Sequence, residues 1–343
     1  IPRGKPMKTV IFAYSRQGCK TARKISECFG ESLLFAPVRL CGDGFHSIPS
    51  PSGFFYGERF SQADALIFVG SCGIAVRSIA PFVKSKQTDP AVLVVDELGT
   101  FVFSLWSGQS GGANALAKKI SEKLGAQPVI TTATDIHGRF SVDAWAAERG
   151  YAIGDMKLAK KISAAVLEGD VPFCSEFPLA ADLPSGLIRG ESGKLGIYVG
   201  VRNRTPFENT LAIIPPVLHL GIGCRRGISA ECIEHAVTRV MDENGIDSRG
   251  IKCVASIDLK AEEPGLLEYC RKKKLPVSFY TEAELKSIPG DFTPSEFVKT
   301  VTGVDNVCER AAMVGADRLL VRKQAIHGVT VAVAAENMEV SFE

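Results

Sequence analysis

The chain contains no C-x-x-C pair among its ten cysteines, and its closest two cysteines are Cys224 and Cys232. This spacing offers no C-x-x-C redox or zinc motif. Cys28, Cys253 and Cys308 stand among apolar residues, as small core side chains do. We therefore expect reduced cysteines without disulfides, which is typical of a cytoplasmic protein.

A strong net charge is also absent, since the formal charge is only +2. Nothing global therefore indicates binding to nucleic acid or to an anionic membrane. The most apolar stretch, around residues 65–76, is too short to span a bilayer, and no signal peptide is recognisable. Aromatic residues make up only 8% of the chain, whereas 33 glycines indicate many tight turns. Any recognition of anions must come from local features.

The chain does contain a regular alternation of apolar runs and amphipathic segments. The expected strands are 9–13, 65–69, 91–95, 100–105, 128–132, 195–200, 217–222, 251–257, 277–280, 318–321 and 329–335. The expected helices include 74–83, 116–124, 157–168, 229–240, 265–273 and 307–314. Residues 96–99 form a turn signal that predicts a β-hairpin. The alternation predicts an α/β fold with mostly parallel sheets flanked by helices.

Residues 169–194 interrupt this alternation. They include Pro172, Pro178 and Pro184 with several glycines, and they show neither helical nor strand periodicity. Such a segment is typical of an inter-domain connection. The predicted organisation is an N-terminal α/β domain at 7–168, a linker at 169–194 and a C-terminal α/β domain at 195–343.

Three strand-to-helix loops are rich in glycine, small polar residues or arginine. In open α/β sheets such loops bind ligands, because helix N-termini offer unpaired N–H groups and a partial positive charge. The candidate residues are Gly73 and Arg77 in the first loop, Ser107, Gly108, Gln109, Gly111, Gly112 and Asn114 in the second, and Gly223, Arg225 and Arg226 in the third.

Each loop has a structural alternative. The first is equally explained as a plain turn with a surface arginine. The second is better explained by anion binding, because a structural turn needs fewer small polar residues. The third resembles a dinucleotide fingerprint, but its last glycine falls one place late, with Arg226 in that position. Its structural alternative is a solvated pair of arginines. Paired arginines bind carboxylates, so the loops together suit a ligand with several carboxylates.

A few acidic and basic residues also stand where chemistry is expected. Asp96 and Glu97 lie at the predicted hairpin turn, and Lys260 and Glu263 follow a predicted strand. Solvated turn or loop residues are the alternative in both cases. The five histidines are scattered at spacings that form no metal site, so no protein-bound metal is predicted.

At these same segments the sequence resembles the cobalt-precorrin-5A hydrolase family, known as CbiG. The resemblance rests on the stretches GSCGIAVRSIAPFVKSKQTDPAVLVVDELG, FVFSLWSGQSGGANALAKKI, TTATD, LGIGCRRGISAECIEHAV, ASIDLKAEEPGL, GVDNVCERAAM and GVTVAVA. They follow the family's order over nearly the whole chain. The second half alone also resembles a small stand-alone protein of the aerobic cobalamin pathway. One departure is Gln109, where the family often carries histidine.

The resemblance implies a hydrolase that opens the ring A δ-lactone of a cobalt corrinoid and releases the methylated meso carbon as acetaldehyde. The cobalt belongs to the substrate, so no cofactor is expected. Thr131, Thr132 and Asp135 of the TTATD stretch join the expected substrate contacts.

Such a reaction needs a base and donors for an oxyanion. We expect Glu97 or Asp96, or alternatively Glu263, as the base. Backbone N–H groups of residues 107–114 are the expected oxyanion donors, with Gln109 as a further donor. Lys260 or Lys323 is expected to stabilise developing negative charge.

Two other functions stay open at this stage. The chain could be a non-catalytic tetrapyrrole carrier of the same pathway, or a nucleotide-dependent oxidoreductase that uses the third loop. The expected partner is the small-molecule corrinoid, without nucleic acid or membrane. A homo-oligomer, or transient contact with other cobalamin-pathway enzymes, also stays open.

Overall fold

The computed structural model describes residues 7–85, 88–108, 112–294 and 305–342. The chain divides into two compact units. The first runs as far as Gly150 and adds Ala159–Asp170 and Pro184–Leu187, and the second comprises Tyr151–Leu158, Val171–Leu183 and Ile188–Glu343. Among the described helices, none combines the length and apolarity that crossing a membrane requires.

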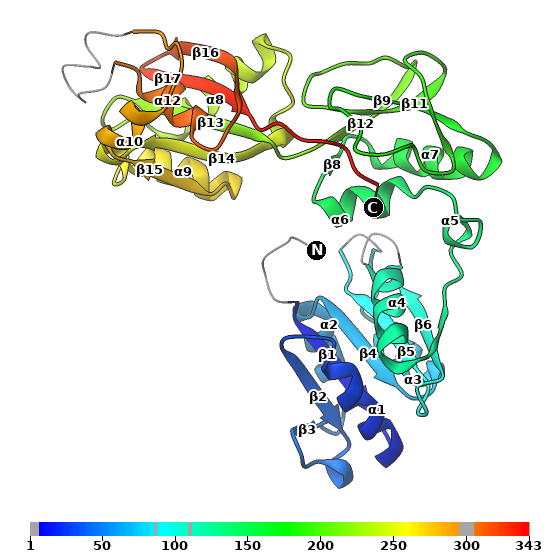
Figure 1. Cartoon of the computed structure of the whole chain (residues 1–343). Helices are drawn as coiled ribbons and strands as arrows, with labels where there is room; N and C mark the ends of the chain where they lie inside the picture. The colour runs from blue at the N-terminus through cyan, green and yellow to red at the C-terminus, as the bar shows by residue number, and fades with distance from the viewer. Residues whose placement is uncertain (1–6, 86–87, 109–111, 295–304, 343) are drawn as a thin grey trace. The chain divides into compact units, whose positions relative to one another are not determined.

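The first unit contains a seven-stranded sheet in the order β3-β2-β1-β4-β5-β6-β7 (Figure 1). Its strands are β1 (Thr9–Ala13), β2 (Ser32–Ala36), β3 (Phe45–Ser47), β4 (Ala65–Val69), β5 (Ala91–Val95), β6 (Phe101–Trp106) and β7 (Gln127–Val129). β1 to β5 are parallel, β6 turns back antiparallel to β5, and β7 is parallel to β6. The predicted hairpin is thus confirmed.

Both faces of this sheet are covered. α1 (Arg16–Ser26) and α4 (Ala113–Leu124) pack on one face, and α2 (Gly53–Gln62) and α3 (Cys72–Ile79) pack on the other. Alternate residues of β4 divide between the two cores, with Ile67 on the first face and Phe68 on the second. Burial on both faces explains why the central strands are continuously apolar rather than alternating. The remaining elements of this part of the chain are η1 (Val38–Leu40), α5 (Ala133–Ile136), α6 (Val142–Arg149) and α7 (Met156–Glu168).

A second sheet corrects the predicted linker. It has the order β10-β9-β11-β12-β8, formed by β8 (Ala152–Ile153), β9 (Val171–Ser175), β10 (Leu187–Arg189), β11 (Leu195–Val199) and β12 (Asn209–Ile214). Residues 169–194 therefore hold two strands, and the boundaries 7–168 and 195–343 do not match the two compact units. β9 and β10 are short, and Pro172 lies within β9, so neither strand has enough alternating residues to reveal a period of two.

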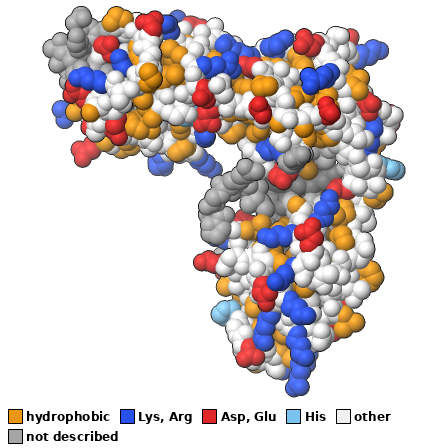
Figure 2. All heavy atoms as spheres, in the orientation of Figure 1, with side chains coloured by type: hydrophobic (Ala, Val, Ile, Leu, Met, Phe, Trp, Pro, Cys, Tyr) orange, Lys and Arg blue, Asp and Glu red, His pale blue; other side chains and the backbone are white. Residues whose placement is uncertain are grey.

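A third sheet, also in the second unit, has the order β15-β14-β13-β17-β16. Its elements are β13 (Leu218–Cys224), α8 (Ala230–Glu243), η2 (Ser248–Gly250), β14 (Ile251–Ile257), η3 (Asp258–Lys260), α9 (Pro264–Lys273), β15 (Val277–Tyr280), α10 (Glu282–Ser287), α12 (Val307–Met313), β16 (Arg318–Ile326) and β17 (Val329–Ala335). β13, β14 and β15 are parallel, whereas β17 is antiparallel to β13. The α/β class is confirmed, with three mixed sheets rather than two. On the face shown in Figure 2, Lys and Arg side chains lie among Asp and Glu, as the small net charge leads one to expect.

Candidate active site

The β5–β6 hairpin separates residues that were expected to act together. Asp96 and Glu97 follow the end of β5, at the edge where the parallel strands end. Ser107 follows the end of β6, which runs in the opposite direction. Five strand residues at about 3.3 Å each place the two groups roughly 16 Å apart. The expected pairing of an Asp96 or Glu97 base with the 107–114 loop is therefore wrong.

The Asp96 carboxylate accepts three backbone hydrogen bonds within the turn. It accepts hydrogen bonds from the backbone N–H groups of Leu98 at 3.2 Å, Thr100 at 2.7 Å and Phe101 at 2.5 Å. Glu97 has an exposed side chain, and its carbonyl oxygen accepts a 2.6 Å hydrogen bond from the Thr21 hydroxyl. These contacts give both residues a structural role in the turn.

Gly73 and Arg77 lie at this same edge of the sheet, on α3. The helix is capped by Ser71, whose hydroxyl accepts from the Gly73 N–H at 3.3 Å. Arg77 is exposed, and its guanidinium lies 3.4 Å from the position that a Cβ at Gly73 would take. The first glycine loop is therefore a capped helix start with an arginine folded over it.

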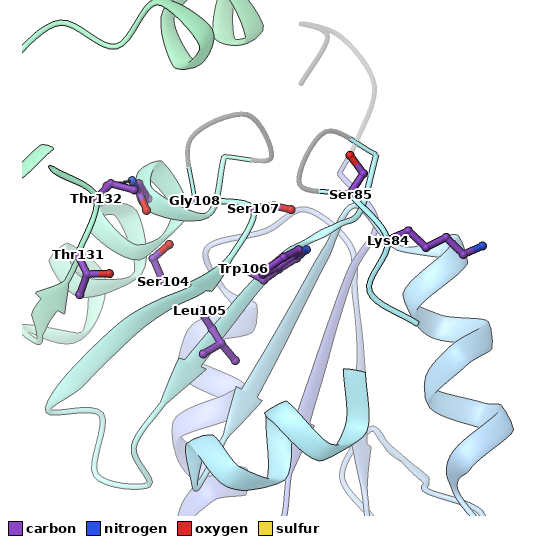
Figure 3. Close-up of a pocket in the computed structure, with 10 residues that line it drawn as sticks. Lys84, Ser85, Ser104, Leu105, Trp106, Ser107, Gly108, Thr131 and Thr132 are labelled. Carbon is purple, nitrogen blue, oxygen red and sulfur yellow. Dashed lines mark hydrogen bonds between the residues drawn. The ribbon is translucent and has the colours of Figure 1, made fainter. Parts of the chain in front are cut away.

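The opposite edge holds a pocket of about 310 Å³ (Figure 3). Three separate segments form it, and its lining residues are Lys84, Ser85, Ser104, Leu105, Trp106, Ser107, Gly108, Asn114, Thr131 and Thr132. It therefore brings together the second loop and the TTATD segment with the segment that precedes β5. Figure 3 shows the Lys84 amine directed away from Trp106.

A buried aspartate, Asp89, ties two walls of this pocket together. Its carboxylate accepts from the backbone N–H groups of Lys84 at 2.8 Å and Ser85 at 2.9 Å, and from the Trp106 indole N–H at 3.1 Å. Its carbonyl oxygen accepts from the Ser107 hydroxyl at 3.3 Å. These donors are partly buried. Removing the carboxylate would destabilise the protein, because each donor would lose its partner.

On another wall, Asn114 organises a polar network. Its buried amide donates to the Thr132 hydroxyl oxygen at 2.9 Å and to the Asp135 carboxylate at 3.0 Å. The Thr132 hydroxyl in turn donates to the same carboxylate oxygen at 2.7 Å. Lys118 lies 3.8 Å from the other oxygen of Asp135. The predicted residues Asn114, Thr132 and Asp135 are therefore in direct contact.

The backbone of the 107–114 loop differs from the predicted oxyanion site. The N–H of Ala113 donates to the Ser107 carbonyl at 3.2 Å, and that of Asn114 donates to the Gly108 carbonyl at 2.8 Å. These two N–H groups are therefore not available to an oxyanion. Gly112 has φ +81° and caps α4, while Gln109 and Gly111 lie outside the described residues.

Glycine at position 108 allows the loop to pack closely against the Asn114 side chain. A Cβ there would lie 2.7 Å from the side-chain oxygen of Asn114. The neighbouring Ser107 adopts a left-handed conformation with φ +55°. The small residues of this loop thus permit a tight approach of the β6 end to α4.

The third loop, in the second unit, contacts Glu263 and Lys260. The Glu263 side chain is only 5% exposed, and it accepts from the Gly227 N–H at 2.7 Å and from the Lys260 amine at 3.1 Å. Burial acts to raise the pKa of Glu263, but these donors and nearby Arg226 outweigh it and hold the pKa below its usual value. A carboxylate stabilised in its charged form is a poor proton acceptor, which argues against Glu263 as the base.

The glycines of the third loop serve packing. A Cβ at Gly221 would lie 1.7 Å from the Cys308 carbonyl of α12, and one at Gly223 would lie 2.5 Å from the Thr330 hydroxyl. This explains the G-x-G pattern without a nucleotide. Arg225 and Arg226 are exposed, whereas the Lys323 backbone N–H donates to the buried carboxylate of Glu309 at 2.7 Å.

Sequence reasoning missed five lining residues of the pocket, namely Lys84, Ser85, Ser104, Leu105 and Trp106. It also missed Asp89, which accepts hydrogen bonds from three of them. Asp89 stands just before Pro90 and β5, in a stretch that looks like an ordinary connection. The described residues contain no group of three or more His, Cys, Asp or Glu side chains arranged to hold a metal ion.

Comparison with known proteins assigns the chain to a family. Family models described as Cobalamin synthesis G N-terminal and Cobalamin synthesis G C-terminus match residues 55–135 and 218–334. The cobalt-precorrin-5A hydrolase of Salmonella typhimurium is 32% identical over 345 residues, covering 95% of this chain and 97% of that protein. The cobalt-precorrin-5A hydrolase of Priestia megaterium is 34% identical over 351 residues, covering 94% of each.

The second half has a separate counterpart. Protein CobE of a Sinorhizobium species is 36% identical over 121 residues, which cover 34% of this chain and 79% of that protein. This confirms the resemblance of the second half to a stand-alone protein. Because the chain is similar over nearly its whole length to two cobalt-precorrin-5A hydrolases, it belongs to the cobalt-precorrin-5A hydrolase (CbiG) family.

Proposed function

We propose that this protein hydrolyses cobalt-precorrin-5A, opening its ring A δ-lactone and releasing the meso carbon as acetaldehyde to leave cobalt-precorrin-5B. The observation that carries the proposal is the similarity, over nearly the whole chain, to two proteins with the name cobalt-precorrin-5A hydrolase. The cobalt enters and leaves with the substrate. The protein has to supply a pocket, a proton acceptor and hydrogen-bond donors.

The chemistry is an ester hydrolysis followed by a carbon–carbon cleavage. Water adds to the lactone carbonyl and loses a proton, and the tetrahedral intermediate collapses to a carboxylate and an alcohol on the meso carbon. The alcohol then loses its proton and becomes the aldehyde as its bond to the macrocycle breaks. The bonding electrons pass into the conjugated ring, which takes up a proton. No oxidant or reductant is consumed.

We place the lactone edge of the substrate in the pocket at the end of β6. Its volume of 310 Å³ is at the lower end of the roughly 300–1,000 Å³ that small-molecule pockets span. A pocket of that size takes one edge of a tetrapyrrole rather than the whole ring. The exposed Arg225 and Arg226 of the third loop remain separate candidates for binding a carboxylate.

For water activation we favour Asp135 over the acids named from sequence. Among the described residues, Asp89 and Asp135 contribute carboxylates that contact lining residues of the pocket, and neither is itself a lining residue. Asp89 is buried, whereas the Asp135 side chain is 23% exposed and so remains reachable by water. Thr132 and Asn114 hold the carboxylate in place, which a general base requires.

Turnover in ¹⁸O-labelled water tests the chemistry directly. Attack at the lactone carbonyl places one heavy oxygen in the corrinoid carboxylate, because the original ring oxygen stays on the meso carbon. We expect the corrinoid product to gain one ¹⁸O atom, read by mass spectrometry under anaerobic conditions. Binding with an unchanged corrinoid mass would contradict a hydrolase and favour a carrier.

A further inference from the structure

Ser104 carries a buried hydroxyl without a hydrogen-bond partner among the described residues. It lies on β6 and lines the pocket described above. Figure 3 shows it on the wall between Trp106 and the Thr131–Thr132 segment. A buried hydroxyl without a partner destabilises a protein, so its presence in a pocket points to a partner that arrives with the ligand.

The same strand presents an aromatic ring to the pocket. The pairing of β5 with β6 shifts register between Val92 and Leu93, which pair with Trp106 and Ser104 respectively. Both Leu105 and Trp106 then pack against one core cluster. A register shift of this kind changes the direction in which side chains point. As a result, Trp106 lies on the same face of β6 as Leu105 instead of on the opposite face. The Asp89 carboxylate fixes the indole through its N–H.

These two side chains suit a flat conjugated ring with an oxygen-bearing substituent. An indole whose N–H is already bonded offers its apolar surface, and a hydroxyl can donate to a carbonyl or carboxylate oxygen. The backbone N–H groups of Ala113 and Asn114 already donate within the loop. The Ser104 hydroxyl has no partner among the described residues and can therefore donate to a ligand.

We propose that the Ser104 hydroxyl donates a hydrogen bond to the ring A acetate oxygen of the corrinoid, with the Trp106 indole packed against the macrocycle beside it. The inference rests on the proposed function, because it takes the corrinoid as the ligand of this pocket. It makes Ser104 and Trp106 substrate-binding residues of the same site.

The test compares Ser104 with a second serine whose buried hydroxyl also lacks a described partner. Ser121, on α4, also has a buried hydroxyl without a described partner, but it does not line this pocket. Ser104→Ala and Ser121→Ala should both leave thermal stability unchanged or slightly higher, since each removes an unsatisfied group. Only Ser104→Ala should weaken binding of cobalt-precorrin-5B, by about tenfold. This product is the probe because it binds without reacting.

Trp106 provides an independent arm of the test. Trp106→Ala should weaken cobalt-precorrin-5B binding by about fivefold, whereas Trp106→Phe should keep most of the affinity because it keeps a ring. Equal affinities for Ser104→Ala, Ser121→Ala and the parent protein would overturn the inference, even if the parent hydrolyses its substrate. A parent protein that binds with these dependences but does not turn over would instead contradict the proposed function alone. A parent that does not bind the corrinoid would contradict both.

Discussion

The Trp106 indole N–H donates a 3.1 Å hydrogen bond to the carboxylate of Asp89, 17 residues earlier in the chain. The same carboxylate oxygen also accepts from the backbone N–H groups of Lys84 and Ser85. One buried group therefore connects the segment before β5 with the end of β6. This connection gives the pocket its shape.

Asp89→Ala should destabilise the protein by about 2–4 kcal/mol, because it removes a charged acceptor and leaves three partly buried donors without it. Urea unfolding followed by tryptophan fluorescence measures the change. The control is Asp291→Ala, which removes an exposed 3.1 Å ion pair with Arg322 and should cost less than about 1 kcal/mol. Equal costs for the two variants would show that Asp89 does not hold the pocket together.

Asp135→Asn should lower kcat by about 100-fold or more if Asp135 activates water, since general bases contribute about that much. Glu97→Gln should keep the parent kcat, because Glu97 lies at the other edge of the sheet. Steady-state assays of corrinoid turnover compare the two variants. The reverse result, with Glu97 essential and Asp135 dispensable, would move the active site to the carboxyl ends of the parallel strands.

Gly108→Ala should reduce turnover more than stability. The added methyl group would lie 2.7 Å from the Asn114 side-chain oxygen, and that side chain would rotate away from Thr132 and Asp135. Because a flexible side chain can give way, the unfolding free energy should fall by only about 1 kcal/mol. Gly53→Ala is the control, since a Cβ there meets nothing within 4 Å. Unimpaired turnover in Gly108→Ala would separate the Asn114 network from catalysis.

The unfolding free energy of the protein should depend on pH through the charge of His219. Its Nδ1 lies 3.0 Å from the Val314 carbonyl oxygen and its Nε2 lies 2.7 Å from the Glu336 carboxylate. Both partners are acceptors, so both ring nitrogens donate and the imidazole is charged. The neighbouring Cys253 side chain raises the pKa of His219 most, burial opposes the rise, and Glu336 adds to it, so that the pKa is raised to about 9.

A folded-state pKa above the unfolded value of about 6.5 stabilises the protein fully below pH 6.5. This stabilisation is lost as the pH rises through about 9. The unfolding free energy of the parent relative to His219→Gln should therefore fall by about 1–3 kcal/mol between pH 6 and pH 9.5. Urea unfolding at several pH values measures it. A constant difference between the two proteins would mean that His219 is neutral in the fold.

Much of the fold could be predicted from sequence because its signals are local. The runs that became β4 and β5 are continuously apolar, and the 96–99 turn marked the hairpin. β9 and β10 escaped because they are short and lie among prolines. The formation of such short strands depends mainly on pairing with neighbouring strands, which the residues of the strand alone do not indicate.

The candidate site could be predicted only in part. Glycine and small polar residues marked the second loop, and Asn114, Thr132 and Asp135 do meet there. The hairpin already implied that Asp96 and Ser107 lie at opposite edges, because it reverses the chain between them. Asp89 could not be recognised, since its importance comes from three donors that only the tertiary fold brings to it.

The most direct measurement is anaerobic incubation of the purified protein with a large excess of cobalt-precorrin-5A, with acetaldehyde trapped and the corrinoid weighed by mass spectrometry. The account predicts one acetaldehyde for each corrinoid converted, over many turnovers per protein. Tight binding of the corrinoid with unchanged mass and no acetaldehyde would contradict it.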